Sequence, residues 1–347
     1  MAIRNADYWA RRMQIMDDAL LNQGFAYVQN LERQFDRAIA SIDRDIAAWF
    51  QRFADNNAVS YTEARRLLNS GELREFRWTV QDYTRHAREN SLDGRWIRQL
   101  ENASARVHIS RLDALKLQLQ QQAELLHGGQ LDRMDVLMRR IYTDGFHKTA
   151  FELQRGIGTG WTFHAPNEAT ISRVLSRPWT LDGQTFTDRV WTNKQALVNS
   201  VNTHLTQSII RGEGHREAIA AVTRDMGVAK HKAARLVMTE SAYFASAAQH
   251  DCFRELGVER FVIVATLDAD TSELCQALDG KVFKMSEYQV GLTAPPFHPW
   301  CRTCTAPYFA DMAELGQRAA RDPETGKTVA TIPRNIPYPE WRERFAA

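Results

Sequence analysis

The fold is decided first by the stretch Trp9–Phe53, WARRMQIMDDALLNQGFAYVQNLERQFDRAIASIDRDIAAWFQRF. Its apolar side chains recur every third, fourth or seventh residue, which is the period of one face of an α-helix. They are Trp9, Met13, Met16, Leu20, Tyr27, Leu31, Phe35, Ile39, Ile42, Ile46, Trp49 and Phe53. An irregularity near Gly24 leaves one long helix or two successive helices as alternatives. Either way the apolar stripe must be covered by partner helices.

Helical spacing continues over most of the following chain, with glycines as the expected boundaries. The stretch Ser60–Glu63 is typical of a capping box that begins a helix. A long stripe is expected to stop at Gly128 and Gly129, and a later break is expected at Gly227. The further predicted helices cover residues 72–89, 97–126, 131–154, 188–210, 213–226 and 229–256.

Between the helical parts, residues 156–187 contain glycines, prolines and turn residues in place of the helical period, which indicates a connector. The run from Gly156 to Gly160 could be compared with a phosphate-binding loop. No apolar strand leads into it, however, and Pro166 follows closely, so a flexible hinge is favoured.

The period changes again at Gly257. The stretch Glu259–Thr266 is rich in β-branched and aromatic residues and predicts a strand, and a second short strand is expected over Lys281–Phe283. The predicted fold is therefore a mainly α N-terminal region of long helices followed by a small α+β C-terminal module. The predicted domains are a long-helix region (1–155), the connector (156–187), a helical region (188–256), the α+β module (257–310) and an extended tail (311–347).

Composition excludes several classes of protein. The chain has 347 residues, of which 44% are apolar and 25% charged, so it can bury a core and is not expected to be disordered. No apolar run approaches the roughly 20 residues that cross a bilayer, and the first residues lack a secretory signal, so we expect no membrane partner and a cytoplasmic site of synthesis. The net charge is +2 and the charged residues are evenly spread along the chain. The sequence therefore lacks the concentrated basic segment that is typical of nucleic-acid-binding proteins.

The residues that could carry chemistry lie in the C-terminal module. Cys275, His298, Cys301 and Cys304 are residue types that bind zinc, and the last three recur at every third position, as in a tight turn that directs ligands to one point. Together they would form a closed, structural site for one zinc ion. The alternative is that the cysteines are buried thiols and His298 bonds to a carbonyl oxygen.

Local caps around this centre are also predicted. Asp270 or Thr271 is expected to cap the helix that carries Cys275, and Gly280 is expected to end it in the left-handed conformation.

Three enzymatic interpretations are weaker. A zinc deaminase requires Pro directly before the first Cys of its Cys-x-x-Cys pair, whereas Pro299 is one residue too far from Cys301. The stretch Asp268–Ser272 begins like a calcium loop, but Glu273 stands where Gly is required. A Cys275–His298 nucleophile pair remains an alternative, although no oxyanion hole is evident.

The same residues resemble a known family. The stretches Thr266–Cys275 and Pro295–Arg302 look like the MuF-type module of tailed-phage minor head, or head morphogenesis, proteins, and Arg235–Ala242 resembles that family's helix with a Thr-Glu pair. Members often continue as Cys-Arg-Cys, whereas Thr303 stands before Cys304 here. This difference weakens the inference that Cys304 is a ligand.

The resemblance implies a virion component without catalytic activity, located in the head interior or at the portal after assembly in the host cytoplasm. Its implied partners are the portal protein and other head proteins. A weak contact with double-stranded DNA is a further expected interaction. Its implied role is to assist head assembly and DNA packaging or ejection. The alternative is a zinc- or thiol-dependent hydrolase or a toxin-like effector.

Other motif residues receive structural roles. We assign Asp268, Thr271, Asp279 and Arg302 to loops and caps around the metal centre. Thr239 and Glu240 are either part of a polar helix surface or, for Glu240, the buried partner of Arg302, because a buried Glu needs a partner. The structural-motif set is Thr239, Glu240, Asp268, Thr271, Asp279, Gly280 and Arg302.

Overall fold

A computed structural model describes residues 6–57, 111–211 except 159 and 161, 215–268 and 271–309. The capping box Ser60–Glu63, the helix predicted over 72–89 and the tail 311–347 lie outside these described residues. The fold class is as predicted, with long helices followed by a small three-stranded module. No helix within the described ranges is long and apolar enough to cross a membrane.

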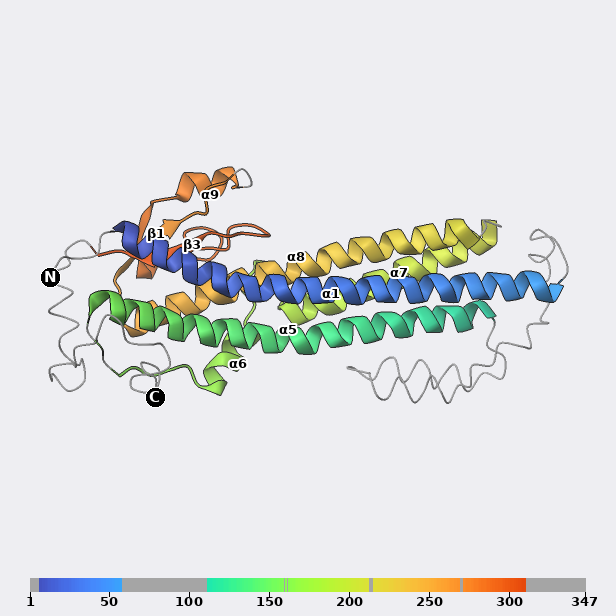
Figure 1. Ribbon diagram of the computed structural model, residues 1–347, viewed down its shortest axis with the longest axis horizontal. Helices are drawn as coiled ribbons and strands as arrows, with labels where there is room; N and C mark the ends of the chain where they lie inside the picture. The colour runs from blue at the N-terminus through green and yellow to red at the C-terminus, as the bar shows by residue number, and fades with distance from the viewer. Residues whose placement is uncertain are drawn as a thin grey trace. The chain divides into compact units, whose positions relative to one another are not determined.

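The elements are shown in Figure 1. They are α1 (Ala6–Asn57), α5 (Arg111–Ile157), α6 (Glu168–Ser176), α7 (Phe186–Arg211), α8 (His215–Glu255), β1 (Arg260–Val264), α9 (Glu273–Leu278), β2 (Val282–Lys284), a 3-10 turn η1 (Met285–Glu287) and β3 (Cys304–Pro307).

The helices are longer than the glycine positions predicted. Helix α1 passes through Gly24 as one helix, α5 continues through Gly128 and Gly129, and α8 continues through Gly227. The expected stops at Gly128, Gly129 and Gly227 are therefore wrong. A glycine costs a helix interior only about 1 kcal/mol, which packing along a long helix easily offsets.

The chain forms two compact units, each built from several segments. The first contains Met1–Val28, Met134–Thr185 and Arg235–Ala347, and the second contains Gln29–Arg133 and Phe186–Ala234.

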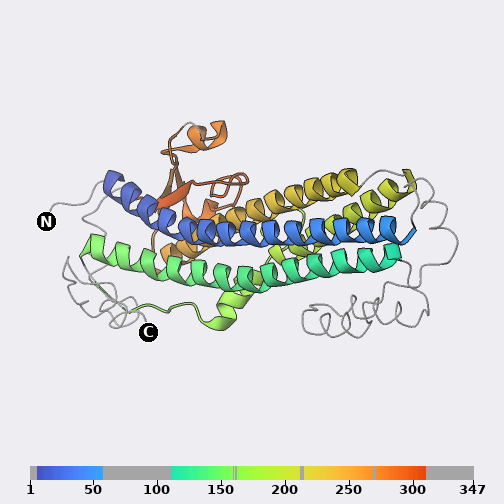
Figure 2. The same cartoon turned by 45° about the vertical axis from the view of Figure 1, so that its right-hand side comes forward.

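In the second unit, parts of α1, α5, α7 and α8 run side by side, as Figures 1 and 2 show. Polar contacts join α8 to α1 and to α7. Lys230 Nζ of α8 pairs with Asp36 Oδ1 of α1 at 2.8 Å, and Ser200 Oγ of α7 donates to Asp225 Oδ2 of α8 at 2.9 Å. The apolar stripe of α1 predicted from the sequence faces this interior, since Leu31, Phe35, Ile42 and Ile46 are all buried.

The same interior holds a buried ion pair. Lys194 Nζ of α7 lies 2.9 Å from Glu124 Oε1 of α5, and both side chains are less than a tenth exposed. The ammonium also lies 4.1 Å from the centre of the Trp191 ring. A buried charge needs such partners, because its desolvation costs several kcal/mol.

His127, one turn along α5 from Glu124, is a buried titratable group. Its Nδ1 lies 2.9 Å from the Ala123 carbonyl oxygen, and its ring meets Phe35 edge-on. Burial, with a smaller contribution from the nearby Lys194 charge, lowers the pKa of His127 from 6.5 to about 4.

We therefore expect the protein to lose stability as pH falls from about 6.5 to about 4. In this window the unfolded chain binds a proton at residue 127 and the folded chain does not, so acid favours unfolding. The loss should approach roughly 3 kcal/mol, since a tenfold change in proton affinity is worth about 1.4 kcal/mol. Urea unfolding of wild type and His127→Gln at several pH values measures it. The hypothesis fails if both proteins show the same pH slope.

In the first unit, two pairs of helices approach closely at glycine positions, where one helix has no side chain. A Cβ added at Gly24 of α1 would lie 2.7 Å from Ser241 Oγ of α8, and one added at Gly145 of α5 would lie 3.0 Å from Ala248 Cβ. Ser241 cannot easily move away, because its hydroxyl donates to the Val237 carbonyl oxygen at 2.8 Å. These glycines therefore serve helix packing.

The sheet of this unit has the strand order β2-β1-β3, with both pairings antiparallel. Phe261 pairs with Phe283 on one side and with Pro307 on the other. The two predicted strands are confirmed within one or two residues, while β3 was not predicted. Gln249 of α8 accepts a hydrogen bond from the Thr305 amide at 3.2 Å, which ties β3 to α8.

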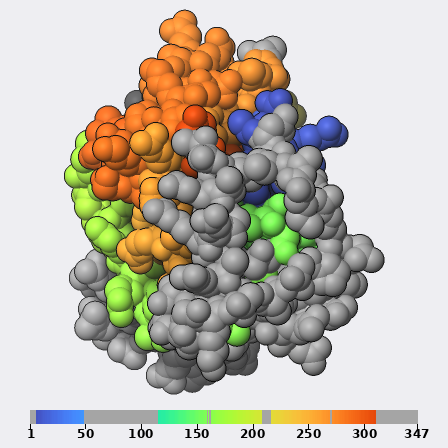
Figure 3. Space-filling model, turned by 90° about the vertical axis from the view of Figure 1, so that its left-hand side faces the viewer, coloured from blue at the N-terminus to red at the C-terminus, as the bar shows by residue number. Residues whose placement is uncertain are grey.

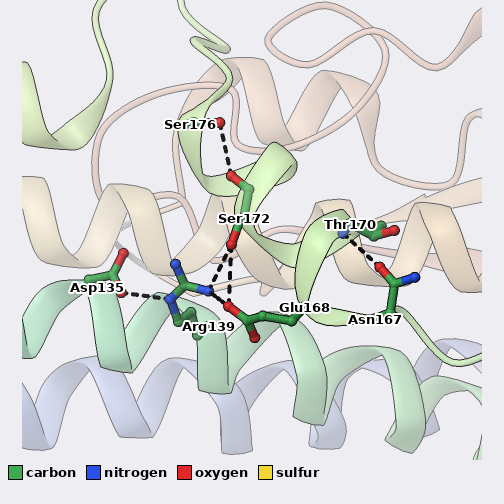
Figure 4. A network of polar contacts seen from close by, with 7 residues as sticks. All are labelled: Asp135, Arg139, Asn167, Glu168, Thr170, Ser172 and Ser176. Atoms are coloured by element: carbon green, nitrogen blue, oxygen red, sulfur yellow. Dashed lines mark hydrogen bonds and ion pairs between the residues drawn. The ribbon is translucent and has the colours of Figure 1, made fainter.

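The connector contains a helix that the sequence did not predict. Asn167 caps α6 by accepting a hydrogen bond from the Thr170 amide at 2.9 Å. Figure 4 shows Arg139 of α5 held between Asp135 of its own helix and Glu168 and Ser172 of α6. The predicted connector therefore contains a short capped helix bound to α5, where no helical period was seen in the sequence.

The glycine run also has a different role from the predicted hinge. Gly156 is still helical and lies against Trp9, so an added Cβ would come within 2.3 Å of the indole ring. Gly158 follows in the left-handed conformation (φ 81°), and its amide donates to the Gln154 carbonyl oxygen at 2.8 Å. The run thus packs and ends α5.

Gly156→Ala is expected to destabilise the protein by about 1–3 kcal/mol, because the methyl group overpacks against a rigid, buried ring. Gly129→Ala in the same helix is the matched control. Nothing lies within 4 Å of its added Cβ, so it should stabilise by up to about 1 kcal/mol through helix propensity. Thermal unfolding measures both, and equal effects would contradict the packing role.

Candidate metal centre

Cys275 is fixed by the start of α9. Ser272 is the N-cap, and its hydroxyl accepts a hydrogen bond from the Cys275 amide at 3.2 Å. The prediction that Asp270 or Thr271 caps this helix is therefore wrong. Thr271 instead holds the preceding loop, because its hydroxyl accepts from the Asp268 amide at 2.8 Å.

The end of α9 joins the centre to the sheet. Gly280 is left-handed (φ 73°), as predicted, and its amide donates to the Ile263 carbonyl oxygen at 2.9 Å. Asp279 Oδ1 accepts from the Ala265 amide at 2.9 Å. These two bonds anchor α9 to β1 and to the residue that follows it.

A tight turn presents His298 and Cys301. The Cys301 amide donates to the His298 carbonyl oxygen at 3.2 Å, with Pro299 and the left-handed Trp300 (φ 64°) between them. Pro followed by a residue of positive φ is the pattern of a type II turn. His298 Nδ1 lies 2.8 Å from the Pro299 carbonyl oxygen, which favours the ring proton on Nδ1 and leaves Nε2, on the side of Cys275, as the ligand atom.

Three of the four predicted ligands converge. Cys275 Sγ lies 3.2 Å from His298 Nε2 and 3.9 Å from Cys301 Sγ, and all three ligand atoms lie within 4.8 Å of one another. Zinc bonds of about 2.3 Å to sulfur and 2.0 Å to nitrogen give tetrahedral edges of roughly 3.8 Å between sulfurs and 3.5 Å between sulfur and nitrogen. The donor types and spacings therefore fit a zinc ion.

The electrostatics of the group favour metal binding. The pKa of Cys275 is lowered to about 4, chiefly by the hydrogen bond that its sulfur accepts from the Cys301 thiol. That same bond, with burial, raises the pKa of Cys301. The hydrogen bond from Cys301 therefore favours the thiolate form of Cys275, and thiolates are the form that binds metal.

Cys304 does not join this group. It lies on β3 opposite Val264 of β1, and it is buried. Burial, together with the negative charges of Asp17, Asp18 and Asp279, raises the pKa of the Cys304 thiol. The closed set of four ligands expected from the sequence is therefore not what the structure brings together. Cys252 on α8 is a buried core thiol, as predicted.

Arg302 and Glu240, which the sequence offered as possible partners of each other, each contact another residue. Arg302 forms a two-fold ion pair with Asp268, at 2.6 and 2.7 Å. Glu240 is buried, and its Oε2 accepts from Trp179 Nε1 at 2.9 Å. The Trp179 ring stacks on Tyr243. The structure thus supplies partners other than the Glu240–Arg302 contact that was considered.

Thr239 beside this pair is half-buried, and its hydroxyl donates to the carbonyl oxygen of Arg235, one turn back on α8, at 2.7 Å. This bond agrees with a local helical role.

Comparison with known proteins finds similarity over part of the chain. Residues 199–306 match the family described as Phage Mu protein F like protein. This matched region is called the Mu F-like domain, after the family to which it is similar. The minor head protein GP7 of Bacillus phage SPP1 is a distant relative, 24% identical over 234 residues that cover 62% of this chain and 73% of GP7. No solved structure matches the chain significantly.

The match confirms the resemblance seen in the sequence. The Mu F-like domain includes the second half of α7, all of α8, the sheet and the Cys275–His298–Cys301 group. Trp179, the partner of Glu240, precedes it.

Some functional details of the Mu F-like domain escaped the sequence analysis. Ser272 was missed although Ser is a common N-cap, because Asp270 and Thr271 beside it are equally good candidates. Thr303, whose hydroxyl helps to lower the pKa of Cys275, gave no signal at all. The strand β3, which carries Cys304 away from the group, could not be seen in four residues that end in proline.

The geometry predicts one zinc ion per full-length chain. Cys275→Ser and Cys301→Ser should each lower zinc affinity at least about tenfold, because a ligand is lost. Cys304→Ser and Cys252→Ser are matched controls at buried thiols outside the group, and they should keep the ion. Metal analysis with competitive chelator titration measures this. Loss of zinc in Cys304→Ser equal to that in Cys301→Ser would contradict the three-residue assignment.

Proposed function

We propose that this chain is a minor capsid, or head morphogenesis, protein of a tailed phage. It associates with the portal in the head interior and assists head assembly and DNA packaging or ejection. The observation that carries this proposal is the Mu F-like domain over residues 199–306. The name of the relative, a minor head protein, supports the same assignment.

The metal centre supports a structural role in this proposal. Cys275 and Cys301 are each only 2% exposed and pack with Ala265 and Phe297, so a substrate has little access to the sulfur atoms. When bound, zinc would supply a cross-link, and Cys275, His298 and Cys301 would hold it. The cross-link would join α9 to the segment before β3, two parts of the module that lie far apart in the sequence.

The helices are suited to protein partners. Near-neutral net charge fits packing among proteins better than tight binding to DNA, whose phosphates attract strongly basic surfaces. The proposed partners are the portal protein and other head proteins, with at most weak contact to double-stranded DNA. The proposed location is the virion, reached from the host cytoplasm during assembly.

A hydrolase or toxin-like effector is the second candidate, and one observation favours it. Three protein ligands leave a fourth position around zinc, which in catalytic sites holds water or substrate. Turnover of model ester or peptide substrates by zinc-loaded protein, lost in Cys301→Ser, would support this candidate over the structural one.

The proposed function predicts that the tagged full chain co-purifies with the portal protein and is found in heads purified from infected cells. Cys301→Ser should reduce the number of copies per head severalfold, because the module is loosened. Cys304→Ser, the matched control, should be incorporated normally. Quantitative mass spectrometry of heads at successive assembly stages measures the copies. Absence of the wild-type chain from all head intermediates would overturn the proposal.

A further inference from the structure

The C-terminal module contains a Cys-x-x-Cys sequence, Cys301-Arg-Thr-Cys304, of the kind that pairs in redox proteins. The structure places a different cysteine next to Cys301. Its sulfur lies 3.9 Å from that of Cys275, which is 26 residues earlier in the chain. We infer that Cys275 and Cys301 form a reversible disulfide when no metal holds them and a small two-electron oxidant is present.

The backbone already holds these two residues at bonding range. Cys275 is fixed by the Ser272 cap at the start of α9, and Cys301 by its turn to His298. A disulfide needs its sulfurs about 2.0 Å apart, and rotation of the two side chains can supply the approach from 3.9 Å. Both thiols are buried together, so a bond between molecules is disfavoured.

Cys304 is the wrong partner despite its sequence position. It is held in β3 by its antiparallel pairing with Val264 of β1. Cys301 instead packs with Cys275, Ala265 and Phe297. Cys304 is thus fixed by strand pairing, whereas the sulfur of Cys301 already lies 3.9 Å from that of Cys275.

The chemistry balances with hydrogen peroxide as oxidant. One thiol is oxidised to a sulfenic acid as peroxide is reduced and releases water. The second thiol then attacks that sulfur, the sulfur–sulfur bond forms, and a second water leaves. Two thiols and one peroxide give one disulfide and two waters, and a dithiol reductant reverses the step.

Metal and oxidant compete for the same two sulfurs. A zinc ion bound by Cys275, His298 and Cys301 occupies the electron pairs that would attack peroxide or the sulfenic acid. The module can thus be cross-linked by metal in a reducing cell and by the disulfide outside it, where thiols oxidise. The inference concerns the cysteine pair alone, so it stands or falls apart from the assignment to the phage head.

The test uses the full chain, stripped of metal with a chelator and treated with hydrogen peroxide. We expect intact mass spectrometry to show a loss of two mass units, for two hydrogens. Digestion without reductant should then yield a peptide pair linked through Cys275 and Cys301. The Cys304→Ser variant should behave like wild type, and the Cys301→Ser variant should lose the two-hydrogen product.

The outcomes are distinct. Any of three results with the wild-type chain would overturn the inference: a link between Cys301 and Cys304, a link between two chains, or no loss of mass. These results do not depend on whether a variant folds. Zinc added before peroxide should slow the mass loss at least about tenfold, because the thiolates are ligated. Equal rates of disulfide formation with and without bound zinc would contradict the competition between metal and oxidant.

Discussion

The position of β1 between two antiparallel partners determines much of the Mu F-like domain. β2 follows α9 in the chain, and β3 follows the turn that carries His298 and Cys301. Because both strands pair with β1, the segments that precede them are brought to the same end of the sheet. The backbone bond from Gly280 to Ile263 and the side-chain bond from Asp279 to Ala265 then fix α9 there. The sulfurs of Cys275 and Cys301 meet as a result of this ladder.

The long helices were predictable from the sequence, and their boundaries were not. Apolar periodicity over residues 9–53 reports the buried face directly, and that face is buried in the structure at Trp9, Met13 and Phe35. A glycine, in contrast, carries no information about its neighbours. Gly156 lies against an indole ring while a Cβ added at Gly129 would meet open space, yet the two look alike in the sequence. Only the packing of the folded protein distinguishes a glycine that a neighbouring side chain requires from a glycine that the helix merely tolerates.

The candidate site was predictable to the extent that it depends on spacing. Cys275, His298 and Cys301 were selected as ligand types near turns, and local turns bring His298 and Cys301 together. Cys304 was selected by the same rule and is placed elsewhere, because its position depends on pairing with Val264 of β1, forty residues away in the chain. The partners of Glu240 and Arg302 were missed for the same reason. Each is set by tertiary contacts, to Trp179 and Asp268, that the local sequence does not encode.

The buried pair of Lys194 and Glu124 has a consequence for how this sequence can vary. The two charges face each other across α7 and α5, and both are shielded from water. Replacing one alone strands the other without a counter-ion, at a cost of about 3–5 kcal/mol, whereas replacing both with apolar residues of similar volume is often neutral or stabilising. The two positions are therefore constrained to change together during divergence, and relatives should carry either both charges or neither.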